Sequence, residues 1–575
     1  MVHKVTKTHI FLFCILFFSF FLRLLWIDKV PNTVTGDELT YIITAKSVQL
    51  SGTNMHNTWS IWKGLLFQYP EGERQAELPY FLLLPFVGIS GNSLFWIRFP
   101  YALMTTCIVL FTYLITKRLF GVRAGLVAGI FASINPWFFS IGRTAYEMTP
   151  ATLFYLISLF FILDTHKKRI YIAIPFLILA FYSYIATKLL FLPFIVLGVS
   201  YAFLSSKERK ISLPHISLIL TGIGFVGFFL ITQFQTNGSR MNELFLPNDM
   251  SIQQTVDSTR KATIQNPLLG VLVNKGTIYI WTLIGKTFAA ISPSYLFFEG
   301  DLFFSLWHGF LYPIDMIFIV FGLISLVTKK KYTGIFFLLL LAMSLLPQIL
   351  HKTLDNFSPH ITLFIPLLII ISAYGLTECM NLIQKKVFQY AFLLVFFCVY
   401  GIFFVNFLHT YFFRSQLEGR TGFDMRVLSH YVLLARTKDS ELVVISSSPS
   451  DLFRKYLFYT DSLQKNTIHT LQKNTQDKNY SFNNVTFLPC ESHVPLSENP
   501  FTLVIDSDCK EIANTNPYIN ISRLNDGGSK YKIYNDKICS QFELKSFPFG
   551  ITIGDFAVES MPVSQFCQTF ITKFN

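Results

Sequence analysis

The sequence predicts a mostly helical protein that crosses a membrane many times and carries a soluble α/β domain at its carboxyl end. Of its 575 residues, 52% are hydrophobic and only 14% are charged, too few to cover a water-soluble globule. Apolar runs close to bilayer-spanning length recur throughout residues 1–411. Residues 412–575 have the composition of an ordinary soluble domain. These observations predict two domains, divided near residue 411.

Eleven apolar segments are expected to span the membrane. In order they are residues 9–27, 96–116, 124–141, 146–163, 171–185, 189–204, 213–231, 310–327, 333–350, 361–376 and 387–408. Lys and Arg gather in every second connection between them, as expected for loops on the cytoplasmic side. The net charge of +13 therefore reflects membrane topology, and no nucleic-acid partner is expected.

This charge pattern places the amino terminus in the cytoplasm. Lys4 and Lys7 precede the first apolar run, and no small-residue cleavage site precedes Asp28, so the segment is expected to stay as an uncleaved span. Two long loops, at about residues 28–95 and 233–308, then share the outer side with the C-terminal domain. The sequence thus predicts an integral protein of the cell membrane with an extracytoplasmic C-terminal domain.

The C-terminal domain is expected to alternate strands and helices. Short apolar runs at residues 441–448, 483–489 and 501–507 are typical of buried strands, and residues 424–436 and 449–460 are typical of helices. No glycine-rich phosphate loop occurs, so we assign no nucleotide.

Four of the eight cysteines lie in this domain, at Cys490, Cys509, Cys539 and Cys567. An even number outside the cytoplasm predicts two disulfides, for which three pairings exist. We expect the sequential pairing.

Two adjacent carboxylates, Asp37 and Glu38, follow the first span. A capping box is the structural explanation, in which Thr35 and Glu38 satisfy free amides at a helix start. Gly52 would end the same helix about four turns later. This explanation accounts for Glu38 and leaves Asp37 as a candidate for chemistry.

Several cations lie at the outer ends of spans. Arg143 and Glu147 are one helical turn apart, and they form either an interfacial ion pair or part of a cavity wall. Arg98 and Lys188 hold comparable positions, where a cation either binds a phosphate or extends to the lipid headgroups.

The second long loop contains Glu299, Asp301 and His308 among aromatic residues. Carboxylates with a histidine are able to bind a divalent cation, but this spacing is not a known ligand pattern. No cofactor is therefore assigned from the sequence, and a divalent cation stays open. The patterns of soluble serine hydrolases, zinc proteases and P-loop ATPases are missing from the sequence.

The stretch from Pro31 to Ala45, P-N-x-x-x-G-D-E-x-x-Y-x-x-x-A, resembles the first external loop of GT-C class membrane glycosyltransferases. In pattern it is most similar to the protein O-mannosyltransferases and the aminoarabinose lipid A transferases. Further matches follow in the same order, at residues 78–103, 133–148, 182–197, 291–301, 308–323 and 354–376. The resemblance covers most of residues 1–410, and the acidic pair is its diagnostic part.

The resemblance implies an inverting transferase that takes a sugar from a polyprenyl-phosphate carrier on the outer face of the membrane. The acceptor would be a protein hydroxyl, a lipid or a glycan. Asp37 matches the acidic residue proposed as catalytic base or acceptor anchor, and Glu38 matches its neighbour. A carboxylate suits this task because the acceptor hydroxyl must lose a proton as it attacks.

The leaving phosphate needs cations close by. The candidates are Arg143, which we rank first, Arg98 and Lys188. Lys188 stands where the family usually has arginine, and arginine is also frequent in the family near the position of His360 or Thr362.

Two other functions fit the hydropathy. A transporter or flippase of a lipid-linked saccharide would need neither external carboxylates nor a soluble domain, and it often shows an internal repeat, which this sequence lacks. A non-catalytic envelope protein would make the C-terminal domain the working part. The transferase interpretation accounts for more of the sequence.

Overall fold

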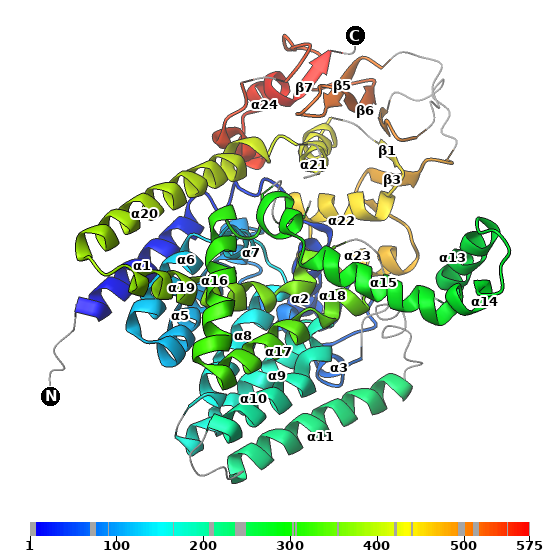
Figure 1. Cartoon of the computed structure of the whole chain (residues 1–575). Helices are drawn as coiled ribbons and strands as arrows, with labels where there is room; N and C mark the ends of the chain where they lie inside the picture. The colour runs from blue at the N-terminus through cyan, green and yellow to red at the C-terminus, as the bar shows by residue number, and fades with distance from the viewer. Residues whose placement is uncertain are drawn as a thin grey trace.

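The computed structural model describes most of the chain. The described residues are 7–68, 76–89, 91–164, 166–205, 212–235, 249–301, 304, 308–352, 356–418, 422–438, 441–492, 501–509, 517–548 and 550–573. Long helices form the larger part of the molecule, and the strands gather near the C-terminus (Figure 1). The predicted fold class, a polytopic helical protein with a C-terminal α/β region, is therefore confirmed.

Most of the expected spans are single helices in the structure. These are α1 (Lys7–Leu24), α5 (Leu94–Phe120), α8 (Met148–Ile162), α9 (Ile170–Ser183), α10 (Phe191–Ser205), α11 (Leu213–Gln235), α16 (Pro313–Lys329), α19 (Phe364–Leu382) and α20 (Lys386–His409). The third expected span is divided into α6 (Val122–Ser133) and α7 (Pro136–Ile141), and the ninth into α17 (Lys331–Ser344) and α18 (Leu346–Leu350).

Seven helical segments in the described part are long and apolar enough to cross a membrane. They begin at Lys7, Leu94, Ala186, Leu213, Lys331, Phe364 and Lys386. Helices α6, α8 and α9 are apolar but shorter. Each of the eleven predicted runs thus coincides with a helix or a helix pair, whereas seven meet the length criterion for a full crossing.

Close contact between α16 and α19 depends on two glycines. A Cβ atom at Gly375 would collide with the carbonyl oxygen of Phe318, and one at Gly322 would collide with that of Ile371. Small residues at such positions let two backbones approach closely, which favours association of apolar helices in a membrane. This pair therefore forms a tightly packed part of the helical bundle.

The two long loops contain helices of their own. The first loop forms α2 (Gly36–Ser51), α3 (Ile61–Leu65) and α4 (Leu78–Leu83). The second forms α13 (Asp249–Lys261), α14 (Leu269–Leu272), α15 (Lys275–Ala290) and the π-helix η3 (Ser294–Glu299). Helices α13 and α14 project away from the rest of the molecule (Figure 1).

The C-terminal region is built on one seven-stranded sheet, in the order β2-β3-β1-β4-β6-β5-β7. The strands are β1 (Leu442–Ser446), β2 (Ser481–Phe482), β3 (Val485–Pro489), β4 (Thr502–Asp506), β5 (Ile519–Ser522), β6 (Ser529–Tyr534) and β7 (Ile571–Lys573). Strand β1 pairs in parallel with β3 and β4, and all residues of β1 and β4 are buried. The three runs predicted as strands are β1, β3 and β4.

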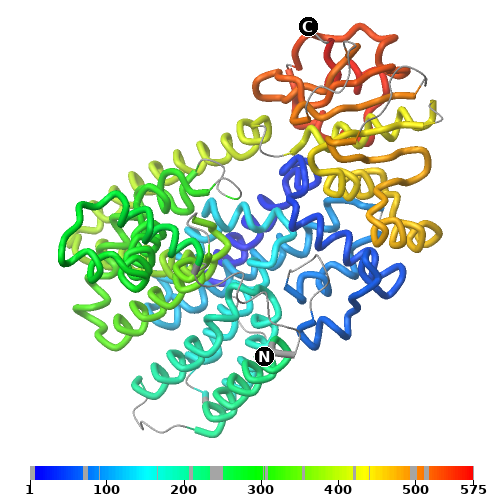
Figure 2. The backbone as a smooth tube through the Cα atoms, turned by 90° about the vertical axis from the view of Figure 1, so that its right-hand side faces the viewer, coloured from blue at the N-terminus to red at the C-terminus, as the bar shows by residue number. Residues whose placement is uncertain are grey.

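Helices α21 (Phe423–Ala435), α22 (Pro449–Tyr459), α23 (Ile468–Gln476) and α24 (Val563–Phe570) accompany the sheet. The disulfides Cys490–Cys509 and Cys539–Cys567 confirm the sequential pairing. Helices α22 and α23 lie against α2 of the first loop (Figure 1). Figure 2 shows the same arrangement from the side, with the C-terminal region beside the blue first loop. The first loop and the C-terminal region therefore lie on the same side of the helical bundle, as predicted.

Candidate active site

Helix α2 begins where the acidic pair was expected to start a helix. Thr35 is its N-cap, and the Thr35 hydroxyl accepts a hydrogen bond from the backbone N–H of Glu38 at 3.2 Å. Gly52 ends the helix with a φ of 81°, a left-handed conformation that glycine adopts without strain. The predicted start and end are both confirmed, but only the threonine half of the capping box applies to the side chains.

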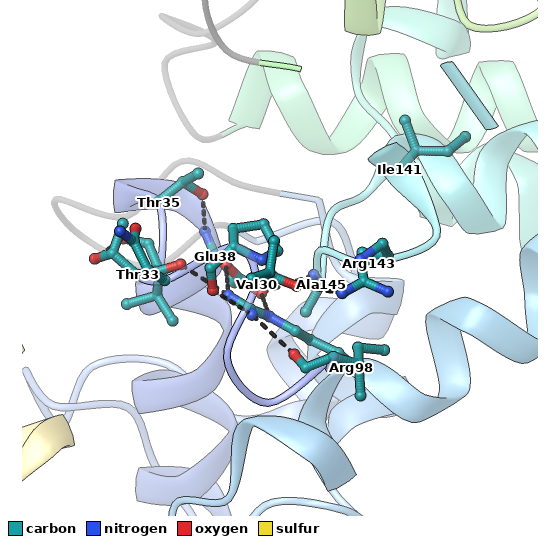
Figure 3. A network of polar contacts seen from close by, with 12 residues as sticks. Val30, Thr33, Thr35, Glu38, Arg98, Ile141, Arg143 and Ala145 are labelled. Atoms are coloured by element: carbon teal, nitrogen blue, oxygen red, sulfur yellow. Dashed lines mark hydrogen bonds and ion pairs between the residues drawn. The ribbon is translucent and has the colours of Figure 1, made fainter. Parts of the chain in front are cut away.

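The Glu38 side chain points into the protein instead of returning to the cap (Figure 3). Its carboxylate lies 3.1 Å from the Nε of Arg98 and accepts a hydrogen bond from the backbone N–H of Ala145 at 3.0 Å. Both partners of this ion pair are fully buried. Glu38 therefore ties α2 to α5 and to the segment before α8, which is a structural role.

Arg98 also holds the chain that leads into α2. Besides Glu38, its guanidinium donates to the carbonyl oxygens of Ile27, Pro31 and Thr33 at 3.1, 2.8 and 2.8 Å. Five donors in a fixed fork suit such a cluster of acceptors. Arg98, predicted as a phosphate ligand, is therefore buried, and its donors are bound to Glu38 and to backbone carbonyl oxygens.

Arg143 has a comparable environment. It donates to the carbonyl oxygens of Arg23 at 2.8 Å and Val30 at 2.6 Å, and it is fully buried (Figure 3). Burial lowers its pKa to about 10, so the group is still charged at neutral pH. Arg143 and Glu147, one helical turn apart, have different partners: the Glu147 carboxylate accepts from the Tyr41 hydroxyl and from the backbone N–H of Ala76.

Asp37 differs from its neighbour because it is exposed. One carboxylate oxygen accepts a hydrogen bond of 2.5 Å from the hydroxyl of Tyr146. Nearby, burial and the Glu147 charge raise the pKa of Tyr41 well above its usual value, which keeps that phenol a proton donor. Asp37 is therefore an accessible carboxylate beside two tyrosines, with the buried Glu38–Arg98 pair behind it.

Lys188 lies in the 3-10 helix η2 (Ala186–Leu190), between α9 and α10. Its ammonium is 3.1 Å from both carboxylate oxygens of Glu77 and sits over the rings of Phe67 and Phe229. It also lines an apolar cavity of about 200 Å³ between α9, α10 and α11. The other lining residues include Phe181, Ile185, Leu189, Leu192, Val226 and Phe229.

The predicted residues of the second loop are not brought together as a metal site. Glu299 is exposed, whereas Asp301 is buried and accepts from the backbone N–H groups of Phe304 and Ser358 at 2.7 and 3.0 Å. His308 is 3.1 Å from the carbonyl oxygen of Gly309, and burial lowers its pKa. In the described part of the chain, no group of three or more His, Cys, Asp or Glu residues is arranged to hold a metal ion.

His360, near a position where the family often has arginine, is buried. Its Nδ1 is 3.3 Å from the side-chain oxygen of Gln348, and its ring packs against those of His351 and Tyr184. Burial and the neighbouring His351 and Lys286 lower the pKa of His360 well below its usual value, so the ring is neutral at pH 7. A neutral imidazole does not supply the charge of an arginine.

The chain is similar to one known protein family and to several solved structures. The family model of dolichyl-phosphate-mannose-protein mannosyltransferases matches residues 76–231. The apo structure of ArnT from Cupriavidus metallidurans has a similar fold, with a TM-score of 0.51 at 13% sequence identity over 91% of this chain and 97% of that one. The chain therefore shares its fold with this ArnT, and residues 76–231 are similar to the mannosyltransferase family.

Two further solved structures resemble the chain less closely in fold. The same ArnT bound to undecaprenyl phosphate gives a TM-score of 0.49 at 11% identity, over 91% of this chain and 98% of that one. The Archaeoglobus fulgidus oligosaccharyltransferase with a tethered acceptor peptide gives 0.44 at 13% identity, over 80% of this chain. This chain spans 63% of that oligosaccharyltransferase. No curated protein sequence matches the chain.

The family match includes Arg98, Arg143, Glu147 and Lys188 but begins after α2. Two groups of this site are not among the residues predicted from the sequence: Tyr146, which donates to Asp37, and Glu77, which pairs with Lys188. Tyr146 stands next to the predicted Glu147, so its position was a usable signal. Nothing in the local sequence marks Glu77 as the partner of a residue 111 positions away.

Proposed function

We propose that this protein is a GT-C class glycosyltransferase, that it transfers a sugar from a polyprenyl-phosphate carrier to an acceptor hydroxyl with inversion, and that Asp37 is the general base. In this step the acceptor oxygen forms a bond to the anomeric carbon while the bond from that carbon to the phosphate oxygen breaks. The acceptor proton passes to Asp37, and the carrier leaves as polyprenyl phosphate. An inverting displacement needs one such base.

The observation that carries the proposal is the difference between the two adjacent carboxylates. Glu38 forms a buried ion pair with Arg98 and accepts a hydrogen bond from a backbone amide. Asp37, in the first turn of the same helix, is exposed. The Tyr146 hydroxyl donates to one Asp37 oxygen, and the exposed carboxylate is accessible to the hydroxyl of an acceptor. We therefore assign Glu38 to the scaffold and Asp37 to proton transfer.

For the donor phosphate we propose Lys188 as the direct contact. Its side chain lines an apolar cavity and its ammonium pairs with Glu77, and a cation beside an apolar cavity suits a carrier that joins a phosphate to an isoprenoid chain. Arg98 and Arg143 are occupied by carbonyl oxygens, so we propose that they act on the phosphate only through their charge. The match of residues 76–231 to the dolichyl-phosphate-mannose-protein mannosyltransferase family supports a carrier of this kind.

The acceptor class and the orientation are also proposals. The charge pattern supports an outward-facing site, with the C-terminal region, residues 412–575, as a separate extracytoplasmic domain. A protein, a lipid or a glycan hydroxyl would each satisfy the chemistry.

The test is an incubation of the purified protein with labelled polyprenyl-phosphate hexose or pentose and a panel of acceptors. We expect a covalently glycosylated product together with free polyprenyl phosphate. Reconstituted liposomes separate transfer from transport: movement of intact donor across the bilayer without a glycosylated product would establish the flippase instead. A Lys188→Gln variant should raise the KM for the donor, since it removes the proposed phosphate contact.

A further inference from the structure

The C-terminal α/β region contacts α2, the helix that carries Asp37, at successive points along its length. Close to its first turn, the Arg454 guanidinium of α22 donates a hydrogen bond of 2.6 Å to the Thr40 hydroxyl. Farther along, the Lys46 ammonium lies 2.5 Å from the carboxylate of Asp461 and 2.7 Å from the side-chain oxygen of Asn92. The contacts of Thr40 with Arg454 and of Lys46 with Asp461 join residues more than 400 positions apart in the chain.

The end of α2 is held by one glutamine of α23. The Gln472 amide nitrogen lies 2.8 Å from the Ser51 hydroxyl, 3.1 Å from the Thr53 hydroxyl and 2.9 Å from the Asn54 carbonyl oxygen. Gln472 is itself buried. A single side chain thus fixes the turn where α2 stops.

The segment that leads into α2 is held from the same side. The Tyr459 hydroxyl is 3.0 Å from the Thr33 hydroxyl and accepts from the backbone N–H of Val34 at 3.2 Å. Arg426 of α21 donates to the Asn32 carbonyl oxygen at 2.6 Å. The start, middle and end of α2 are therefore all anchored to the C-terminal region.

Helix geometry explains why these contacts matter for Asp37. Residues three and four positions apart share a face, so Thr40 and Tyr41 flank Asp37 on either side. Tyr41 donates to Glu147 of the helical bundle, and Thr40 accepts from the C-terminal region. Asp37 lies between the two anchored faces, so any rotation of α2 about its axis would move the carboxylate.

We propose that the C-terminal α/β region is a positioning element for the general base, with Arg454, Asp461 and Gln472 as the positioning residues on its side. This inference rests on the proposed function, because it assumes that Asp37 takes the proton. It assigns the region a role in the rate of the chemical step. A misplacement of about 1 Å can lower a rate by about 100-fold, so modest changes in these contacts should affect kcat.

The test is a charge exchange between Lys46 and Asp461. We expect Asp461→Lys to lower kcat by at least about 10-fold, with the KM for the donor within about 2-fold of the native value. Lys46→Asp in the same chain should restore kcat to within about 3-fold, because the ion pair is re-formed with its charges reversed. Rates are normalised to folded protein, measured by monodispersity and thermal midpoint in detergent.

The matched control is Asp508→Lys. Asp508 is an exposed carboxylate that pairs with Lys530 at 2.6 Å inside the C-terminal region, as Asp461 pairs with Lys46, but its partner lies on β6 and not on α2. We expect this variant to keep the native kcat. A second pair of variants tests Arg454: Arg454→Met should lower kcat, and Arg454→Lys should recover part of the loss.

The outcomes separate this inference from the proposed function. If Asp461→Lys and Arg454→Met keep the native kcat while Asp37→Asn is inactive, the positioning role is wrong. Asp37 would then still be the base. An equal loss of kcat in Asp508→Lys, or no recovery in the exchanged pair, would also overturn it. If the Asp37→Asn variant is active, the proposed function itself is contradicted, because Asp37 is then not the general base.

Discussion

Asp37 and Glu38 are adjacent in the sequence, but their side chains leave α2 about 100° apart. That angle is enough to place Glu38 against Arg98 inside the protein and Asp37 at the surface. The sequence could predict that a helix starts at Thr35 and that Glu38 has a structural use. It could not predict the use itself, because Arg98 is 60 residues away.

The buried pair gives a prediction for Glu38→Gln. This change leaves the Arg98 charge buried without a counter-charge, which costs about 3 kcal/mol or more of stability. We expect a lower thermal midpoint in detergent and a lower yield of folded protein. Asp37→Asn is the control, since it makes the same chemical change one residue earlier at an exposed position. Equal midpoints for the two variants would show that the ion pair does not stabilise α2.

The three basic candidates for phosphate binding show the limit of prediction at the residue scale. The sequence predicted that Arg98, Arg143 and Lys188 all lie near the outer ends of spans. The two arginines donate to backbone carbonyl oxygens of the segment from Arg23 to Thr33. Every residue has a backbone carbonyl, so the sequence does not show which of them will accept a hydrogen bond from an arginine. Lys188 lines a cavity between α9, α10 and α11, and that property depends on how three helices pack.

At the scale of elements, apolar length and strand-like runs were reliable guides. The structure differs where prolines interrupt an apolar run. Asn135 caps α7 by accepting from the backbone N–H of Phe138 at 3.0 Å, and Pro136 occupies the first helical position, where its missing N–H costs nothing. The expected third span therefore became two helices. In the same way, Pro347 lies near the start of α18, where the ninth expected span is divided into α17 and α18.

The contact between α21 and the 3-10 helix η7 (Val558–Ser560) should depend on pH. Arg426 donates to both carboxylate oxygens of Glu559, at 2.7 and 2.6 Å. Burial alone would raise the pKa of Glu559, but the Arg426 charge outweighs it and the pKa is lowered. Because the folded-state pKa is below the unfolded value, this stabilisation is complete above the ordinary value of 4.5 and is lost as the pH falls through the lowered one.

We therefore expect the native protein to exceed Glu559→Gln in stability by about 1 kcal/mol at pH 7, with the difference constant down to about pH 5 and shrinking below it. Thermal midpoints of the two proteins across pH 3–8 measure this. A difference that grows toward acid pH would contradict the assigned ion pair.

At the scale of the whole molecule, two separate parts of the sequence meet at α2. Hydropathy predicted that the first loop and the C-terminal region share one side of the bundle. The contacts between them, such as Lys46 with Asp461, involve surface-type residues without any pattern in the sequence. Long-range polar pairing of this kind follows from the folded geometry alone.

The orientation of the whole chain predicts a labelling pattern. With the four cysteines outside the disulfides replaced by alanine, a cysteine placed at Ser560 should react with a membrane-impermeant maleimide on intact cells. One placed at Lys168, in a basic connection, should react only after permeabilisation. The reverse pattern would place the C-terminal region and Asp37 in the cytoplasm and exclude an outer-face reaction.

The most direct test of the central claim is the rate of sugar transfer by Asp37→Asn, measured beside its affinity for the labelled polyprenyl-phosphate donor. We expect transfer to fall by about 100-fold or more, as for loss of a general base, while donor affinity and thermal midpoint stay native. Transfer within about 3-fold of the native rate would show that another group takes the proton.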